Sequence, residues 1–114
     1  MYQPRLVIAM SEREAKFQVG QIVHQKLFDY IGVVFDVDPE FHGTDEWYQQ
    51  VARSRPPKDE PWYHVLANET VPTTYVAEQN LERTAKPQRI MHPLTDRLFS
   101  EFDGERYTSR QKFN

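Results

Sequence analysis

The sequence contains no cysteine and only four glycines among its 114 residues. The lack of cysteine excludes disulfide bonds and cysteine-ligated zinc sites. The glycines are too scattered to form a phosphate-binding loop, and no G-x-S-x-G motif marks a hydrolase nucleophile. These absences remove the commonest catalytic and nucleotide-binding centres. We therefore predict a protein that is not an enzyme and needs no cofactor.

Long hydrophobic runs are also absent. The longest apolar stretch near the start, residues 6–10, has five residues and is followed at once by Glu12, Arg13 and Glu14. Such a stretch is too short to span a membrane and weak as the core of a signal peptide. Together with the missing cysteines, this favours a cytoplasmic protein with no membrane association.

Charge is unevenly distributed along the chain. The formal net charge is −3, with 4 basic and 2 acidic residues in 1–28, 3 basic and 10 acidic in 29–81, and 7 basic and 5 acidic in 82–114. A strong nucleic-acid binder usually carries a basic stripe, and the acidic middle lacks one. Any contacts with DNA should therefore come from flanking basic side chains, for which the candidates are Lys16, Lys26, Arg83, Lys86 and Arg89.

The length and composition fit one domain. Hydrophobic residues make up 39% and aromatic residues 13% of the chain, and each aromatic side chain buries a large area. We predict an N-terminal extension over residues 1–15, a compact β domain over 16–83 and a partly helical C-terminal extension over 84–114.

Alternating apolar residues predict the strands. In residues 31–37 every odd position is apolar, which is typical of a strand with one buried face, and Gly32 indicates a bulge or a close backbone approach. Weaker patterns of the same kind predict further strands at residues 17–24, 62–67 and 73–77, and a short pairing at 80–82.

Capping residues predict two helices. Thr44 is suited to an N-cap, Asp45 and Glu46 follow it in the first turn, and prolines end the segment. Apolar residues spaced three to five apart predict a second helix over residues 93–104, with a loose tail after it. The predicted fold is therefore mostly β: a small SH3-like barrel of about five antiparallel strands, with one short helix in a connection and a C-terminal helical tail.

Three residues suggest a metal site, but their pattern is weak. His24, His64 and Asp36 have side chains that bind zinc or iron. No two histidines, however, have the spacing of a metal motif, and hydrogen-bonded histidines on strands are the simpler interpretation. The carboxylates Asp36, Asp38 and Glu40 are likewise interpreted as a solvated turn. We predict no metal.

The aromatic side chains have two interpretations. Exposed aromatic rings can stack on bases of single-stranded nucleic acid or supply contact area to a protein partner, whereas buried rings form the core. The alternation in residues 62–67 favours a core position for Trp62 and leaves Tyr63 open. The candidate binding residues in this group are Trp47, Tyr63, His64 and Tyr75.

Four segments together carry a family resemblance. They are FQVGQIVH at 17–24, YIGVVFDVDP at 30–39, PWYHVL at 61–66 and TYVAEQNL at 74–81. In this order they resemble the motifs of the HspQ family, also called the YccV-like or hemimethylated-DNA-binding family.

The resemblance implies an SH3-like barrel in a bacterial cytosol and a heat-shock-associated factor without enzymatic activity. It implies an affinity for hemimethylated DNA, and the acidic middle of the chain should make this binding weak and salt-sensitive. It also implies a role with an ATP-dependent protease in degrading denatured or regulatory proteins such as the replication initiator DnaA. Small homo-oligomers are a further implication. The alternatives are a DNA-binding module without a protease role and, least supported, a small metal-dependent enzyme.

Overall fold

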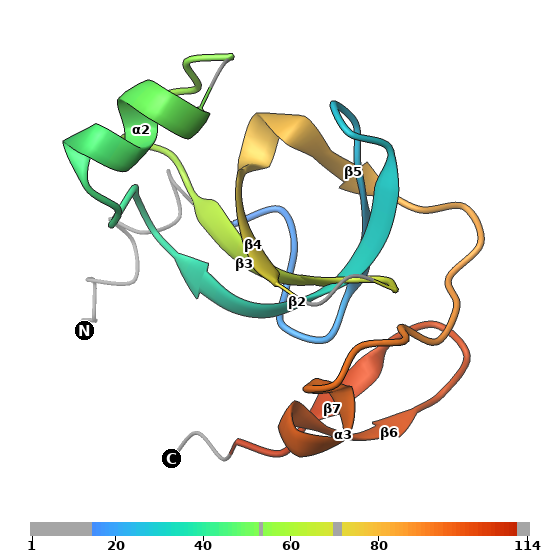
Figure 1. Cartoon of the computed structure of the whole chain (residues 1–114). Coiled ribbons are helices and arrows are strands. Elements are labelled where there is room, and N and C mark those ends of the chain that lie inside the picture. Colours follow the sequence, from blue (N-terminus) through green and yellow to red (C-terminus); the bar gives the residue numbers. More distant parts are fainter. Residues whose placement is uncertain (1–14, 53, 70–71, 112–114) are drawn as a thin grey trace, which may run out of the picture.

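The computed structural model describes residues 15–52, 54–69 and 72–111. Seven strands and three short helices occur in this part of the chain (Figure 1). The elements are β1 (Ile22–Gln25), β2 (Tyr30–Asp38), α2 (Asp45–Val51), β3 (Trp62–Ala67), β4 (Thr73–Ala77), the 3-10 turn η1 (Glu78–Asn80), β5 (Leu81–Arg83), α3 (Thr95–Leu98), β6 (Phe99–Phe102) and β7 (Tyr107–Ser109).

Five antiparallel strands form one curled sheet in the order β4-β3-β2-β1-β5. The predicted strands at 62–67 and 73–77 are confirmed, and α2 has the predicted Thr44 cap, whose Oγ1 accepts from the N–H of Trp47 at 3.1 Å. The prediction of a closed barrel is wrong. The edge strands β4 and β5 are joined by η1 but do not pair, so the sheet is open between them.

A bulge in β2 changes which face its side chains use. Val34 pairs with Val65 and Asp36 with His64, so Phe35 is the extra residue. Val33 packs with Ile22 and Leu66 in a cluster on one face of the sheet, which we call the outer cluster. Val37, beyond the bulge, packs with Val34 and Val65 on the other face, in the inner core cluster. The predicted single apolar face of this strand holds only as far as Phe35.

Gly32 makes the close approach that its position in the strand predicts. A Cβ at this residue would lie 2.5 Å from Cγ1 of Val65 and 2.6 Å from the carbonyl oxygen of Leu66. Only glycine lets β2 and β3 come this close without displacement.

The C-terminal segment forms a hairpin, so the predicted C-terminal helical tail is wrong. Within residues 93–104 only Thr95–Leu98 is helical, and β6 then pairs with β7. Gly104, with φ of +100°, belongs to the turn of this hairpin and does not end a helix. Two amides, of Glu105 and Arg106, donate to Oδ1 of Asp103 at 2.9 Å and hold that turn.

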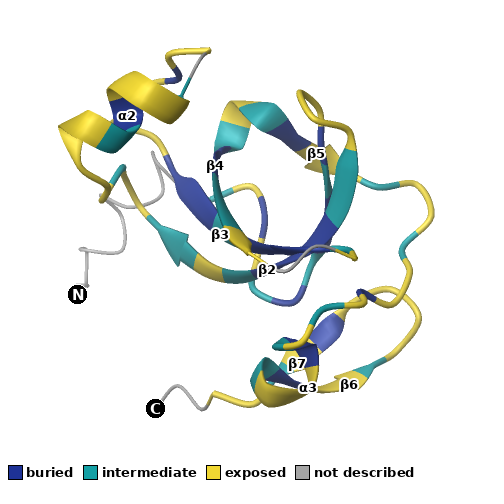
Figure 2. Ribbon diagram, in the orientation of Figure 1, coloured by how far each residue is buried: buried dark blue, intermediate teal, exposed yellow. Residues whose placement is uncertain are grey.

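The hairpin and α2 lie at opposite ends of the sheet (Figure 1). Phe99 and Tyr107 of the hairpin pack with Ile22, Val33 and Leu66 of the sheet. The central strands are accordingly buried, whereas α2 and the outer surface of the hairpin are largely exposed (Figure 2). None of the helices in the described ranges has the length and apolar character that crossing a membrane requires.

Candidate functional site

A hollow of about 360 Å³ lies beside the first turn of the described chain and β5. Three cations line it: Lys16, Arg83 and Arg106. Lys16 and Arg83 are predicted candidates that come from opposite ends of the sequence, and the fold brings them together. We call this feature the basic hollow.

Arg106 was not predicted as a site residue. Its Nη2 donates to Oε1 of Gln18 at 3.3 Å and to the carbonyl oxygen of Val19 at 3.2 Å. A backbone pairing fixes this end of the hairpin, because the N–H of Tyr107 donates to the carbonyl of Gly20 at 2.8 Å. Only the fold shows that this residue, 90 positions after Lys16, belongs to the same surface.

The other predicted cations lie elsewhere. Lys86 follows Thr84 on the chain leaving the hollow, and Arg89 lies 5.4 Å from the ring centre of Phe102. Lys26 lies in the β1–β2 turn, where its N–H donates to the carbonyl of Asn80. Glu105 also lines the hollow, beside Arg106. Among the described residues, the charged groups of these cations and of the three in the hollow form no ion pair. A phosphate can therefore approach them without breaking an ion pair between described residues.

A second feature is a cluster of aromatic rings between α2 and the sheet. The ring of Trp62 lies 4.8 Å from that of Phe41 and 5.2 Å from that of Tyr75, and Trp47 lies 5.8 Å from Tyr75. Trp62 is 2% exposed, and its Nε1 donates to the carbonyl of Pro57 at 3.0 Å. Trp62 thus holds α2 to the sheet, while Trp47 and Tyr75 stay half-exposed.

Beside this cluster lies a second hollow of about 360 Å³, which we call the aromatic groove. It is bounded by the β1–β2 turn, the end of α2 and the edge strand β4. Within the described ranges no lysine, arginine, aspartate or glutamate lines it, and its lining includes the exposed apolar residues Leu27, Phe28 and Val51. The sequence did not single out these three residues, because no local pattern links the two separate segments that carry them.

The predicted candidates in this region have different positions. Trp47, His64 and Tyr75 all line the aromatic groove. Tyr63 is fully buried on the other face of β3, where its hydroxyl accepts from the N–H of Phe17 at 3.2 Å and donates to Oε2 of Glu78 at 2.5 Å. Burial and the Glu78 carboxylate raise the pKa of Tyr63, so its hydroxyl stays protonated.

One group of side chains has the composition of a metal site. Ligand atoms of Asp36, Asp38 and His64 lie within 4.8 Å of one another. Oδ2 of Asp38 already accepts from the Tyr75 hydroxyl at 2.6 Å and contacts Nε2 of His64 at 3.1 Å. Burial and this carboxylate raise the pKa of Tyr75. These hydrogen bonds join Asp38, His64 and Tyr75, whereas Oδ1 of Asp36 accepts from the N–H of Val37 at 2.9 Å.

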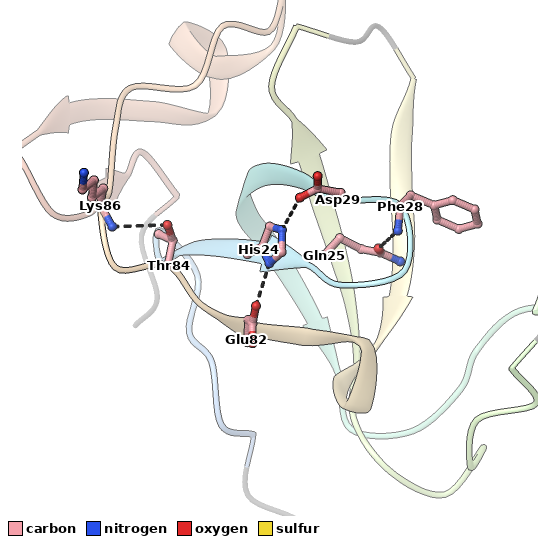
Figure 3. A network of polar contacts seen from close by, with 7 residues as sticks. All are labelled: His24, Gln25, Phe28, Asp29, Glu82, Thr84 and Lys86. Carbon is pink, nitrogen blue, oxygen red and sulfur yellow. Dashed lines mark hydrogen bonds and ion pairs between the residues drawn. The ribbon is translucent and has the colours of Figure 1, made fainter.

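His24 does not belong to that group. Its two ring nitrogens each lie 2.7 Å from a carboxylate oxygen, Nε2 from Asp29 and Nδ1 from Glu82 (Figure 3). The structure thus brings Asp36 and His64 of the predicted metal set together and places His24 in a separate ion-pair network.

The comparisons with known proteins agree with the motif pattern. A family profile described as "Hemimethylated DNA-binding protein YccV like" matches residues 15–106. The chain is 34% identical over 97 residues to F-box only protein 21 of Pongo abelii and of Homo sapiens, and 33% identical to that of Mus musculus. These matches cover 83% of this chain but only 15–16% of the relatives' own length. No solved structure matches the chain. Because the profile covers most of its length, this chain belongs to the YccV-like family of hemimethylated DNA-binding proteins.

Proposed function

We propose that the chain binds duplex DNA through the basic hollow. The observation that carries this proposal is the convergence of Lys16, Arg83 and Arg106 on one surface, where none of them forms an ion pair with another described residue. Basic side chains that neutralise backbone phosphates release counterions, which supplies most of the affinity of such an interface. The family description supports duplex DNA as the ligand, in its hemimethylated form.

With few cations, this binding is weak and falls steeply with salt. Each phosphate contact contributes about 0.9 to the slope of log affinity against log salt. The acidic rest of the chain repels phosphates, so DNA approaches only from the side of the hollow. Lys86 and Arg89 lie on the chain that leads away from the hollow, and they extend the same contact along the phosphate backbone of the DNA.

Binding of the full chain to unmethylated, hemimethylated and fully methylated duplexes tests the proposal. At about 150 mM salt, we expect the hemimethylated duplex to bind most tightly. When affinity is measured over a range of salt concentrations, we expect Arg83→Gln and Arg106→Gln each to reduce the steepness of log affinity against log salt by about 0.9. Arg97→Gln is the matched control, since this exposed cation in α3 lies outside the hollow. Equal and vanishing affinity for all three duplexes would reject the proposal.

A second function is favoured by the aromatic groove. We propose that the chain also acts as a heat-shock-type regulatory factor in the cytoplasm, without catalytic activity. In this role it presents denatured or regulatory proteins, DnaA among them, to an ATP-dependent protease. Exposed Leu27, Phe28 and Val51 supply the apolar contact area that a protein partner needs. We further propose that it works as a small homo-oligomer.

The adaptor role is tested with a Lon-type protease and a substrate that this protease degrades. We expect the degradation rate to rise with the concentration of the chain and to saturate. A rate that stays constant over a broad range of concentration contradicts the adaptor role and leaves the proposed DNA binding untouched.

A further inference from the structure

We propose that the aromatic groove binds an extended, apolar peptide segment with basic flanks from a partner protein, and that this segment pairs with β4 as an added strand. The inference rests on the protein-binding function proposed above. It specifies how the partner is recognised and which part of the partner is bound.

The groove runs along the edge of β4. All five residues of β4, Thr73–Ala77, line it. Val76 packs with the inner core cluster, whereas Ala77 and Tyr75 pack with the aromatic cluster on the opposite face. A hollow lined by both faces of one strand must follow the edge of that strand. The sheet order makes β4 an edge strand, next to the gap at which the sheet is open.

The backbone of β4 is oriented to receive another strand. The N–H of Glu78, directly after β4, donates to the carbonyl of Pro61 at 3.1 Å. Orientation alternates along an antiparallel strand, so Val76 and Thr74 also turn their backbone groups toward β3, and Thr73 and Tyr75 turn theirs away. Within the described ranges β4 pairs with β3 alone, which leaves these outward groups available to an added strand.

Apolar anchors stand beside this edge. Leu27 is 52%, Phe28 68% and Val51 49% exposed, and they are three of the four large hydrophobic side chains exposed in the described part of the chain. Phe28 is held in place: its N–H donates to Oε1 of Gln25 at 2.6 Å, and Gln25 is only 4% exposed (Figure 3). A buried polar side chain thus fixes the turn that presents an exposed aromatic ring.

The charges around the groove define the flanks of the ligand. Among the described residues, no lysine, arginine, aspartate or glutamate lines the groove, and side chains of both signs adjoin it. Asp29 follows Phe28, Asp38 bonds to Tyr75 and Glu46 precedes Trp47, whereas Lys26 precedes Leu27 and Arg55 precedes Pro56. The three carboxylates outnumber the two cations, so the rim as a whole disfavours phosphate groups. Lysine or arginine on either side of an apolar segment is attracted to it, so the favoured ligand is a protein segment and not DNA.

Peptide titration of the full chain tests this inference. The probe is a peptide of ten residues in all, with two lysines at each end and alternating valine and threonine between them. One control peptide has glutamates in place of the lysines, and another has proline at two central positions, which removes backbone donors. Both tryptophans of the chain, Trp47 and Trp62, line the groove, so intrinsic fluorescence reports binding. We expect the lysine peptide to bind at least about tenfold more tightly than either control.

Matched variants locate the site. Phe28→Asp is expected to weaken binding of the lysine peptide at least about fivefold. Met91→Asp should leave binding unchanged, because Met91 is similarly exposed, at 65%, but lies outside the groove. Hydrogen exchange gives the reading specific to strand pairing: the amides of Thr73 and Tyr75 should become protected when the lysine peptide is bound.

Four outcomes overturn the inference. Equal binding of the three peptides removes the role of charge and backbone pairing, and binding without protection of Thr73 and Tyr75 removes the added strand. A fluorescence change that depends on protein concentration alone, and is abolished by Phe28→Asp, identifies a second copy of the chain as the occupant. If no peptide binds while the chain still stimulates the protease, the groove inference fails and the adaptor function stands.

Discussion

Nδ1 of His24 lies 2.7 Å from Oε2 of Glu82, across the pairing of β1 with the edge strand β5. The other ring nitrogen lies 2.7 Å from Oδ1 of Asp29 in the β1–β2 turn (Figure 3). A neutral imidazole can donate only one of these bonds, so the arrangement requires the charged ring. The hydrogen bonds to Asp29 and then Glu82 raise the pKa of His24 above its usual 6.5.

This network predicts a pH-dependent stability. Because the folded-state pKa of His24 is raised, its contribution is fully present below about pH 6.5 and is lost as the pH rises through the folded-state pKa. We expect His24→Gln to lower the free energy of unfolding more at about pH 5.5 than at about pH 8.5. Urea unfolding at both pH values measures the difference. His42→Gln is the control, because this exposed histidine forms no ion pair with another described residue. A pH-independent effect of His24→Gln contradicts the prediction.

Gly32→Ala is expected to destabilise the sheet by about 3 kcal/mol, at the upper end for overpacking. The added methyl would meet Val65 and the backbone carbonyl of Leu66, and the carbonyl cannot move without disturbing the pairing of β2 with β3. Gly104→Ala is the comparison, because its methyl enters open space and only the backbone at φ +100° is strained, which costs about 1 kcal/mol. Urea unfolding of both variants measures the contrast, and similar losses would mean that β2 and β3 can separate locally.

Tyr63→Phe tests a buried hydrogen-bond network. The change leaves the N–H of Phe17 without its acceptor and Glu78 without the Tyr63 hydroxyl, so we expect a loss of about 2 kcal/mol. Tyr30→Phe removes one bond between neutral groups, to Oγ1 of Thr74, and should cost about 1 kcal/mol. Equilibrium unfolding compares the two variants. A cost for Tyr63→Phe no greater than that for Tyr30→Phe would show that the network stabilises the fold no more than a single hydrogen bond between neutral groups does.

The strands could be predicted where one local pattern decides them. Residues 62–67 and 73–77 alternate between the two faces of the sheet and are bounded by proline or turn residues, and the structure has these strands at the same limits. The bulge at Phe35 has no such local pattern. It follows from how β2 meets β3, so the change of face at Val37 could not be predicted.

The C-terminal hairpin shows where local patterns mislead. Leu94, Leu98 and Phe102 have a helical spacing, yet α3 ends at Leu98. Packing decides the outcome, since the ring centres of Phe99 and Tyr107 lie 5.1 Å apart in the hairpin and both side chains pack against the sheet. The basic hollow and the aromatic groove likewise could not be predicted from local patterns. Arg106 reaches the basic hollow, and Phe28 the aromatic groove, only through contacts between distant segments.

The contact between the C-terminal hairpin and the sheet predicts that the two unfold together. Phe99 is 3% exposed and packs in one cluster with Ile22 and Leu66 of the sheet. We expect Phe99→Ala to cost about 3–5 kcal/mol and to shift a single cooperative transition, followed by circular dichroism and by tryptophan fluorescence. Both tryptophans lie at the other end of the sheet, beside α2, so the two probes coincide only if the hairpin and the sheet unfold together. Phe102→Ala is the milder control, because this side chain is only partly buried. If Phe99→Ala leaves the tryptophan transition in place while part of the circular dichroism signal melts early, the hairpin is a separate folding unit. The basic hollow would then lose Arg106 before the sheet unfolds.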